Sequence, residues 1–337
     1  MPHLGRRFPL FAPVILVALA GCSGAGSAPL ASGASQAQAR AFVAPLRSGV
    51  IRQPKPPQAQ TARNVRTAKI ERDLFVSDGS GSVAVLANRS HKNVGQITDG
   101  LNGADGVWVD NAGNLYVANY KSAQVTEYAP GSSTPKCTYS SGLVDPITVT
   151  TDRSGNVYVA DFNDYQDPGY LYKYAQCSNT VTKRYTVILG PTGVAVDRRG
   201  NIFVMAWAEG YGYLLEFKRG RSTPTALGAT VNVPGGLVID NKGNLIADDQ
   251  EVATYQPGSI DIIAPPYYQT SVPLIQGLGD PYHVALNKQQ TRLFSANVNA
   301  GTVTVYSYPA GALLETLGPA QGLTTPYGVS DSPNAVF

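Results

Sequence analysis

The fold is decided by residues 106–119, GVWVDNAGNLYVAN, a stretch that returns in similar form at residues 148–161 as TVTTDRSGNVYVAD. Each copy consists of two short apolar runs separated by a polar turn that contains Gly and Asn. Gly and Asn accept the positive φ that tight turns require, so each copy predicts a β-hairpin. The chain therefore repeats a shape, and the spacing of the copies indicates which architecture they build.

The hairpin recurs at a regular interval along the chain. The residues that open its first strand are Gly106, Thr148, Gly193, Gly236, His283 and Gly328, and their spacings are 42, 45, 43, 47 and 45 residues. Two further short runs follow, for example QVTEYAPG and KCTYSSGL, with no helical stretch between them. Four strands per period of this length are typical of a β-propeller blade.

The two ends of the repeated region complement each other. LFVSDGSGSVAVLANRS, which begins at Leu74, matches a second and third strand without a first, and PYGVSDSPNAVF, which begins at Pro326, supplies a first strand. We expect the C-terminal strand to join the N-terminal blade, because this closes the ring and leaves no blade edge unpaired. The predicted fold is all-β, a six-bladed β-propeller of four-stranded blades over residues 70–337.

The first 22 residues have the composition of an export signal. A basic start, MPHLGRRF, precedes the apolar run PLFAPVILVALA, which is shorter than the roughly 20 residues that a membrane span needs. The ending LAGC resembles the bacterial lipobox, which implies a diacylglycerol group on the thiol of Cys22 and cleavage before it. The expected location is the bacterial cell envelope, with the protein exported and lipid-anchored. The alternative is an ordinary signal peptide that happens to contain a cysteine.

Residues 23–69 are rich in Ala, Ser, Pro, Gln and Arg, and we expect them to form a disordered basic tether. Residues 1–69 hold nine Lys or Arg and no acidic residue, which leaves 17 basic against 23 acidic residues from position 70 onward. A nucleic-acid-binding domain carries a basic face, so this balance argues against nucleic acid as a partner of the propeller. We expect the protein to be a monomer.

The remaining cysteines are Cys137 and Cys177. In an exported protein an even pair of this kind can form a disulfide, and two free thiols are the alternative.

The repeated phrase also resembles a known family. The run G-x-x-x-D-x-x-G-N-hydrophobic-Y-V-A-(D/N), most complete from Gly106 to Asn119 and from Thr148 to Asp161, is similar to the NHL repeat and to the gluconolactonase-like propellers. The resemblance covers roughly residues 70–337 and implies the propeller fold. It leaves the activity open, because such propellers include both binding proteins and enzymes.

Candidate metal ligands come from the ends of the second strands. The first two strands of a blade are antiparallel, so the start of the first and the end of the second lie at one mouth of the central channel. These ends are Asp78, Asn119, Asp161, Ala206, Asp249 and Asn297, and their oxygens could hold a divalent cation such as Ca²⁺. The alternative is that they hydrogen-bond nearby backbone, as we expect of Asp110, Asp152, Asp197 and Asp240 in the turns.

Departures from the repeat mark further candidates at this mouth. His283 stands where the other openings have Gly or Thr, and two loops after second strands are aromatic and acidic, at residues 161–167 and 206–211. The expected ligand-binding rim is Tyr120, Tyr165, Trp207, Tyr211, Tyr282 and Tyr327. Such rings offer broad apolar area with a polar tip, which suits a sugar or a peptide. The alternative is that they belong to the general scatter of tyrosines in an all-β protein.

Two functions follow from these candidates, and a purely structural envelope protein that assembles through its blade edges or its tether is a third possibility. The first is an envelope-anchored module that binds a polypeptide or a glycan at the channel mouth, without catalysis. The second is a metal-dependent hydrolase of the gluconolactonase-like type, whose family holds its divalent ion with a channel-lining Glu plus Asn and Asp. No first-strand opening here carries a Glu. That resemblance therefore implies a rearranged set of Asn119, Asp161, Glu209 and Asp249, with His283 as the catalytic acid or base.

Overall fold

The computed structural model describes residues 73–87, 89–163, 168–187, 189–208, 211–250, 257–269 and 271–332. The predicted signal peptide and tether, with Cys22, lie outside these residues, as do Tyr165 and Glu209. Within the described residues, no helix has the length and the apolar character that a membrane span requires.

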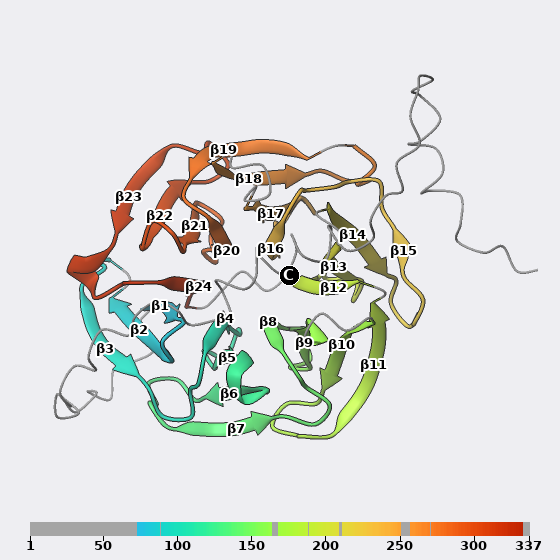
Figure 1. The fold of residues 1–337 in the computed structure, drawn as a ribbon, viewed down its shortest axis with the longest axis horizontal. Helices are drawn as coiled ribbons and strands as arrows, with labels where there is room; N and C mark the ends of the chain where they lie inside the picture. The colour runs from blue at the N-terminus through green and yellow to red at the C-terminus, as the bar shows by residue number, and fades with distance from the viewer. Residues whose placement is uncertain are drawn as a thin grey trace, which may run out of the picture.

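Six four-stranded antiparallel sheets surround a central channel as the blades of a β-propeller (Figure 1). From the channel outward, blade 1 consists of β24 (Pro326–Asp331), β1 (Asp73–Asp78), β2 (Ser82–Ala87) and β3 (Asn93–Ile97), and blade 2 of β4 (Ala104–Val109), β5 (Leu115–Asn119), β6 (Gln124–Tyr128) and β7 (Pro135–Tyr139). In the same order, blade 3 consists of β8 (Pro146–Thr151), β9 (Val157–Asp161), β10 (Gly169–Tyr174) and β11 (Val181–Val187), and blade 4 of β12 (Gly190–Val196), β13 (Ile202–Ala208), β14 (Tyr211–Phe217) and β15 (Thr225–Ala226). Blade 5 consists of β16 (Pro234–Ile239), β17 (Leu245–Asp249), β18 (Gly258–Ile263) and β19 (Val272–Leu278), and blade 6 of β20 (Pro281–Leu286), β21 (Arg292–Asn297), β22 (Thr302–Ser307) and β23 (Leu313–Leu317). The predicted fold is confirmed.

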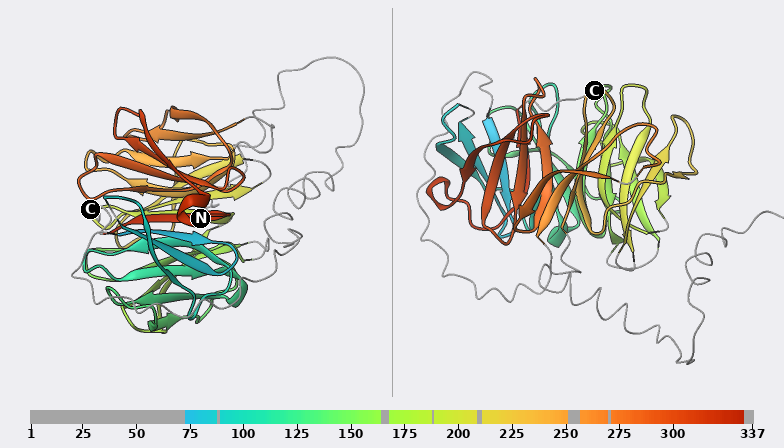
Figure 2. Two further views of the ribbon diagram at one scale, coloured as in Figure 1. Left: turned by 90° about the vertical axis from the view of Figure 1, so that its left-hand side faces the viewer. Right: turned by 90° about the horizontal axis from the view of Figure 1, so that it is seen from above.

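The core lies between adjacent blades. Figure 2 shows the ring edge-on as a disc, with the blades standing side by side. The inner strands have apolar residues on both faces because each sheet is covered on both sides by its neighbours. One buried cluster, for example, joins Tyr116 on β5 to Val159 and Tyr174 on blade 3. The outermost strands are much more exposed, and four of the five residues of β23 face solvent.

The predicted turn chemistry is also confirmed. The Asp110 Oδ1 atom accepts hydrogen bonds from the backbone N–H groups of Ala112 and Asn114 at 2.9 and 2.8 Å. The Asn114 side chain donates to the second carboxylate oxygen at 2.8 Å. Gly113 between them has a φ of 86°, which favours glycine. The same arrangement recurs at Asp152, Asp197 and Asp240, so these four carboxylates hold the hairpin turns.

The ring closes where the two ends of the described chain meet. β24 pairs with β1 in antiparallel register, and the Ser332 N–H donates to the Asp73 carbonyl at 2.9 Å. Gly328 lies where β24 approaches blade 2, and a Cβ atom there would be 2.6 Å from the Asp105 carbonyl oxygen. A Cβ on Gly106 would be equally close to the Ile147 carbonyl. Glycine is therefore common at the first-strand openings because neighbouring first strands touch around the channel.

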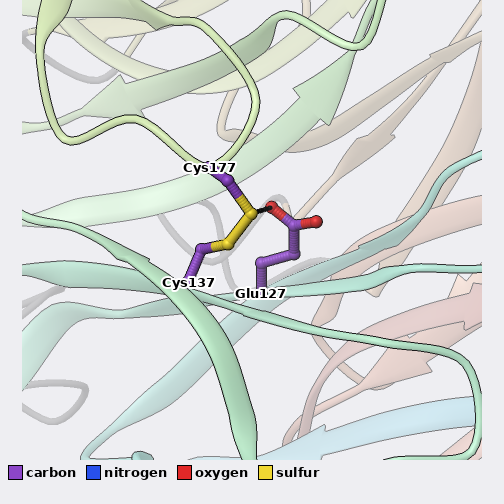
Figure 3. Close-up of side chains that lie close together, drawn as sticks. All are labelled: Glu127, Cys137 and Cys177. Carbon is purple, nitrogen blue, oxygen red and sulfur yellow. Dashed lines mark hydrogen bonds between the residues drawn. A yellow bond between two sulfur atoms is a disulfide. The ribbon is translucent and has the colours of Figure 1, made fainter.

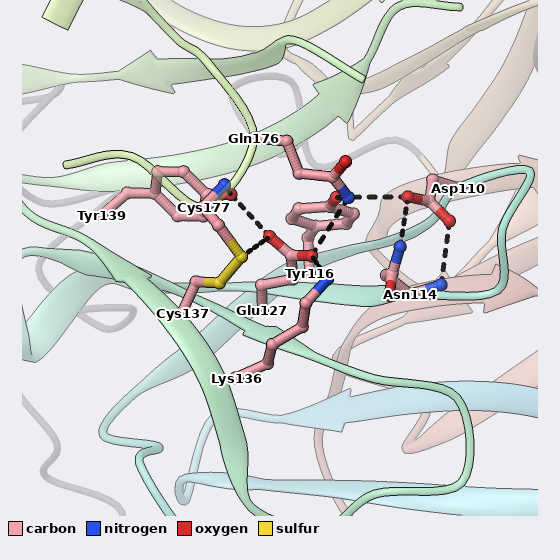
Figure 4. The surroundings of a disulfide bond; sticks show 9 residues. All are labelled: Asp110, Asn114, Tyr116, Glu127, Lys136, Cys137, Tyr139, Gln176 and Cys177. Atoms are coloured by element: carbon pink, nitrogen blue, oxygen red, sulfur yellow. Dashed lines mark hydrogen bonds and ion pairs between the residues drawn. A yellow bond between two sulfur atoms is a disulfide. The ribbon is translucent and has the colours of Figure 1, made fainter. Parts of the chain in front are cut away.

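A disulfide joins blades 2 and 3 at the rim of the disc. Cys137 on β7 and Cys177 in the β10–β11 connection are bonded, with their Cα atoms 5.2 Å apart (Figure 3). The fully buried Glu127 lies beside them, with a carboxylate oxygen 3.8 Å from the Cys177 sulfur. The same carboxylate accepts hydrogen bonds from Lys136 at 2.9 Å and from the Tyr139 hydroxyl at 2.5 Å (Figure 4). The bond and this polar network together link two blades far from the channel.

Candidate functional site: the channel mouth

One mouth of the channel holds a pocket of about 60 Å³ built from two sets of equivalent positions. The first set is the residue just before each first-strand opening. All six of these residues line the pocket: Asp105, Ile147, Thr192, Gly235, Tyr282 and Tyr327. The second set lies at the ends of the second strands: Tyr120, Phe162 and Gln250 directly follow β5, β9 and β17, and Trp207 is the penultimate residue of β13. Asp145, Val233 and Pro234 complete the lining.

The wall of the pocket is largely apolar and aromatic. On one side Phe162, Trp207 and Val233 form a buried cluster. On another side Tyr282 and Tyr327 pack edge to face with ring centroids 5.1 Å apart. Such offset pairs hold both rings in fixed orientations. Aromatic rings thus form much of the pocket wall.

The wall also carries a buried acid, Asp105. Its side chain is almost fully buried, at 2% exposure, and among the described residues its Oδ1 atom has no hydrogen-bond partner. The other oxygen accepts a long hydrogen bond of 3.4 Å from the Tyr282 hydroxyl. Burial raises the pKa of Asp105 well above its ordinary value, and the nearby charge of Asp145 raises it further. An acid in this state gains most from a ligand that brings a donor or a positive charge.

The predicted metal ligands are engaged in the loops that lead to the first strands. The Asp161 carboxylate accepts the backbone N–H groups of Val144 and Asp145 at 3.0 and 2.5 Å. Asp249 accepts those of Asn232 and Val233, both at 2.9 Å, and Asn119 accepts that of Asn102 at 3.1 Å. A cation held by these oxygens would compete with the hydrogen bonds. Metal binding by this set, whose fourth member Glu209 is outside the described residues, stays a prediction.

Among the described His, Cys, Asp and Glu side chains, Glu127, Cys137 and Cys177 bring three possible metal-ligand atoms close together. Two of these three residues are already joined in the disulfide.

The predicted aromatic rim is partly assembled. Tyr120, Trp207, Tyr282 and Tyr327 line the pocket. Tyr211 begins β14, opposite Ala208, and is 62% exposed away from the pocket. Sequence reasoning missed Asp105, Asp145 and Gln250, whereas Phe162 lies in the loop of residues 161–167 that was expected at this mouth. Asp105 stands one residue before the repeated first-strand opening. The residue at this position differs from each blade to the next, except that blades 6 and 1 both carry Tyr, and this variation is the signal that could have found Asp105.

The structure places His283 between blades rather than in the pocket. Its side chain is 6% exposed, and Nδ1 accepts the Val329 N–H of β24 at 3.5 Å. Thr148, at the equivalent position, makes the same kind of contact, donating to the Thr192 carbonyl of the next blade at 2.9 Å. Burial lowers the pKa of His283 to about 4, so the imidazole is neutral at neutral pH.

This burial predicts a pH-dependent stability. The folded-state pKa of His283, about 4, lies below the ordinary value of 6.5, so the unfolded chain takes up the proton first as the pH falls. Stability is therefore lost between pH 6.5 and 4, by about 2 to 3 kcal/mol near the lower end. We expect the His283→Gln variant to lose this dependence, as measured by urea unfolding at neutral and mildly acidic pH.

A matched control is Asp280→Asn. Burial raises the pKa of Asp280 to about 6, so its contribution has the opposite sign and weakens the fold as the pH rises through 6. The two variants should change the slope of stability against pH in opposite directions. Parallel profiles for wild type and His283→Gln would contradict the assignment.

The fold and the mouth define a class: a six-bladed β-propeller with a small, largely aromatic pocket at one end of its channel. The sequence matches no family model and no curated protein. Among solved structures, a chain of the nidogen/laminin complex is similar with a TM-score of 0.61 at 17% identity, over 77% of this chain and 97% of that one. The hydrazine synthase of Kuenenia stuttgartiensis is similar with a TM-score of 0.58 at 14% identity, over 82% and 94%. A gluconolactonase of Xanthomonas campestris is similar with a TM-score of 0.53 at 16% identity, over 67% and 80%. At these identities the likeness concerns the fold alone.

Proposed function

We propose that this protein is a binding module that holds a polypeptide or a glycan at the channel mouth. One observation carries the proposal. The six equivalent positions that line the pocket hold Asp105, Ile147, Thr192, Gly235, Tyr282 and Tyr327. Two residues further along the same strands, the six equivalent positions are all buried aliphatic residues: Val107, Val149, Val194, Leu237, Val284 and Val329. A pocket-lining position with only a structural role would carry similar residues in all six blades, as the aliphatic position does. The different residues at the lining positions therefore support a role in recognition.

The propeller similarity supports the proposal at the level of the fold. One of the similar structures comes from a protein–protein complex, that of nidogen and laminin. We place the module at the bacterial cell envelope, on the strength of the N-terminal sequence and its resemblance to a lipobox at Cys22. Equal recovery of wild type and the Cys22→Ser variant in the membrane fraction would contradict lipid anchoring.

Blocking the mouth tests the proposal. Thr192 is a half-buried lining residue, and the Thr192→Trp variant would place an indole in the pocket. We expect ligands retained by the wild-type chain on glycan and peptide arrays to be lost with this variant, with affinity reduced roughly tenfold or more. Thr182→Trp, on the exposed outer strand β11, is the matched control and should bind as wild type does. Equal retention by all three proteins would exclude the mouth as the binding site.

The alternative is a metal-dependent hydrolase. Two buried carboxyl groups at the mouth, Asp105 and Asp145, favour it, together with the resemblance to gluconolactonase-like propellers. Titration of Ca²⁺, Mn²⁺ and Zn²⁺ into the full chain tests it. Binding in the micromolar range that is lost in Asp105→Asn would support a site at the pocket, and loss only in Asp161→Ala would support the predicted ligand set. If no ion binds, the hydrolase has no metal centre and the alternative fails.

A further inference from the structure

We propose that the group received by the channel mouth is a protonated amine, an organic ammonium on a short apolar stem. The inference rests on the proposed binding function and names the chemistry of its ligand. A lysine side chain offers both the ammonium and the stem, whereas an amino sugar offers the ammonium on a hydroxylated ring. The argument depends on one buried acid, on the aromatic wall around it and on the lack of a competing cation among the described lining residues.

The first argument is the Asp105 carboxyl. Its Oδ1 atom is buried in the lining of the pocket without a hydrogen-bond partner among the described residues, and its other oxygen accepts a long contact of 3.4 Å from the Tyr282 hydroxyl. Buried polar atoms in native structures are nearly always hydrogen-bonded, so an exception at a pocket points to a missing donor. An ammonium supplies up to three donors and a charge opposite to that of a carboxylate.

The second argument is the aromatic wall. Five rings line the same pocket: Tyr120, Phe162, Trp207, Tyr282 and Tyr327. A cation within about 6 Å of a ring centroid is attracted by the negative face of the ring, and the attraction grows when water is excluded. The exposed Lys121 already places its ammonium 5.4 Å from the centroid of Tyr120. The apolar faces also suit the carbon stem of an amine better than they suit an anion or a fully hydrated metal ion.

The third argument concerns charge and size. The described lining residues include the acids Asp105 and Asp145 and no Lys, Arg or His, so the formal charge of the lining is negative when these carboxyl groups are ionised. Hard divalent cations prefer six or more oxygen ligands, whereas this wall is mainly carbon. A volume of about 60 Å³ holds a few water-sized groups, which matches an ammonium with its first carbon atoms rather than a whole sugar ring.

The two tryptophans of the chain make the test direct. Trp207 lines the pocket, whereas the indole N–H of Trp108 donates to Thr151 at 2.9 Å, outside the lining. In the full chain with Trp108→Phe, the emission therefore reports on Trp207 alone. We expect n-butylammonium to change this emission saturably and butan-1-ol, its neutral counterpart, to bind at least roughly tenfold more weakly.

Two further arms identify the source of the amine. A Gly-Lys-Gly peptide with an acetylated N-terminus is compared with the same peptide acetylated at the lysine as well, and a glucosamine trimer with the N-acetylglucosamine trimer. Acetylation removes the charge and leaves the rest of the molecule in place. If the natural ligand is a peptide, we expect acetylation to weaken binding of the peptide roughly tenfold or more, and if it is a glycan, we expect the same of the glycan.

Variants connect the effect to the acid. Asp105→Asn keeps the size of the side chain and removes its charge, and it should weaken n-butylammonium binding roughly tenfold. Asp99→Asn, an exposed acid outside the lining, is the matched control and should leave binding unchanged. The acetylation comparison uses the chain with Asp105 intact and remains decisive if Asp105→Asn does not fold.

Three results would overturn the inference: no response to n-butylammonium, equal binding of charged and acetylated ligands, or displacement of n-butylammonium by micromolar Ca²⁺. Equal binding of an acetylated ligand at Trp207 would leave the binding function of the mouth intact. Peptide or glycan retention that is insensitive to Thr192→Trp would instead contradict the proposed function itself, so the two failures are distinguishable.

Discussion

A chain that ends at Thr325 is expected to lose the cooperative unfolding transition of the propeller. This truncation removes β24, the innermost strand of blade 1, and leaves the edge of β1 unpaired. It also uncovers the apolar residues packed around Val329, which is fully buried between blades 1 and 6. The free energy of unfolding of a domain is only about 5 to 15 kcal/mol, and the loss of a whole inner strand should cost more than this. Circular dichroism during urea unfolding checks this.

Two controls separate ring closure from a local loss of packing. Val329→Ala removes two methyl groups from the same strand and should cost only about 1 to 3 kcal/mol, with the transition retained. A synthetic peptide of residues 326–337, added to the truncated chain, should restore β24 and with it the transition. A truncated chain with the wild-type midpoint and slope would show that the ring does not depend on this strand.

Removal of the Cys137–Cys177 disulfide has the second-largest expected effect. The bond closes a loop with a sequence separation of 40 residues. A cross-link of that span restricts the unfolded chain and stabilises the fold by about 3 to 4 kcal/mol in the chain-entropy account. The Cys137→Ser/Cys177→Ser double variant should therefore unfold at lower denaturant concentration with a transition that is still cooperative, because blades 2 and 3 also share a buried apolar cluster.

The double variant also supplies its own control. A reducing agent should lower the stability of the wild-type chain to that of the variant and should leave the variant unchanged. Ligand binding at the channel mouth should persist in both, because the bond lies at the rim of the disc. If the wild-type unfolding curve matches that of the double variant and does not change on reduction, the disulfide does not stabilise the fold.

The fold could be predicted because the same local signals recur in four of the six blades. The D-x-x-G-N turn has one favourable backbone solution, and hydrogen bonds such as those of Asp110 and Asn114 produce it each time. Ring closure followed from the complementary fragments that begin at Leu74 and Pro326. Such signals depend on a few neighbouring residues, so a single sequence contains all the information they need.

The site was predicted less completely because side-chain direction alternates along a strand. Tyr282 and His283 are neighbours, yet the first lines the pocket and the second contacts β24 of the next blade. A shift of one residue moves a side chain to the other face. Tyr211 failed to join the rim because β13 continues to Ala208 and pairs with it. Asp105 carried no motif, and its importance comes only from the burial of an oxygen without a partner.

The closure of the ring also fixes the side of the disc on which the described chain begins. β24 begins at the mouth with Pro326 and Tyr327 and runs to the opposite side of the disc, where Ser332 is hydrogen-bonded to Asp73. The chain thus enters the propeller on the side away from the pocket. A bulky ligand can therefore approach the pocket without meeting the start of the described chain at Asp73.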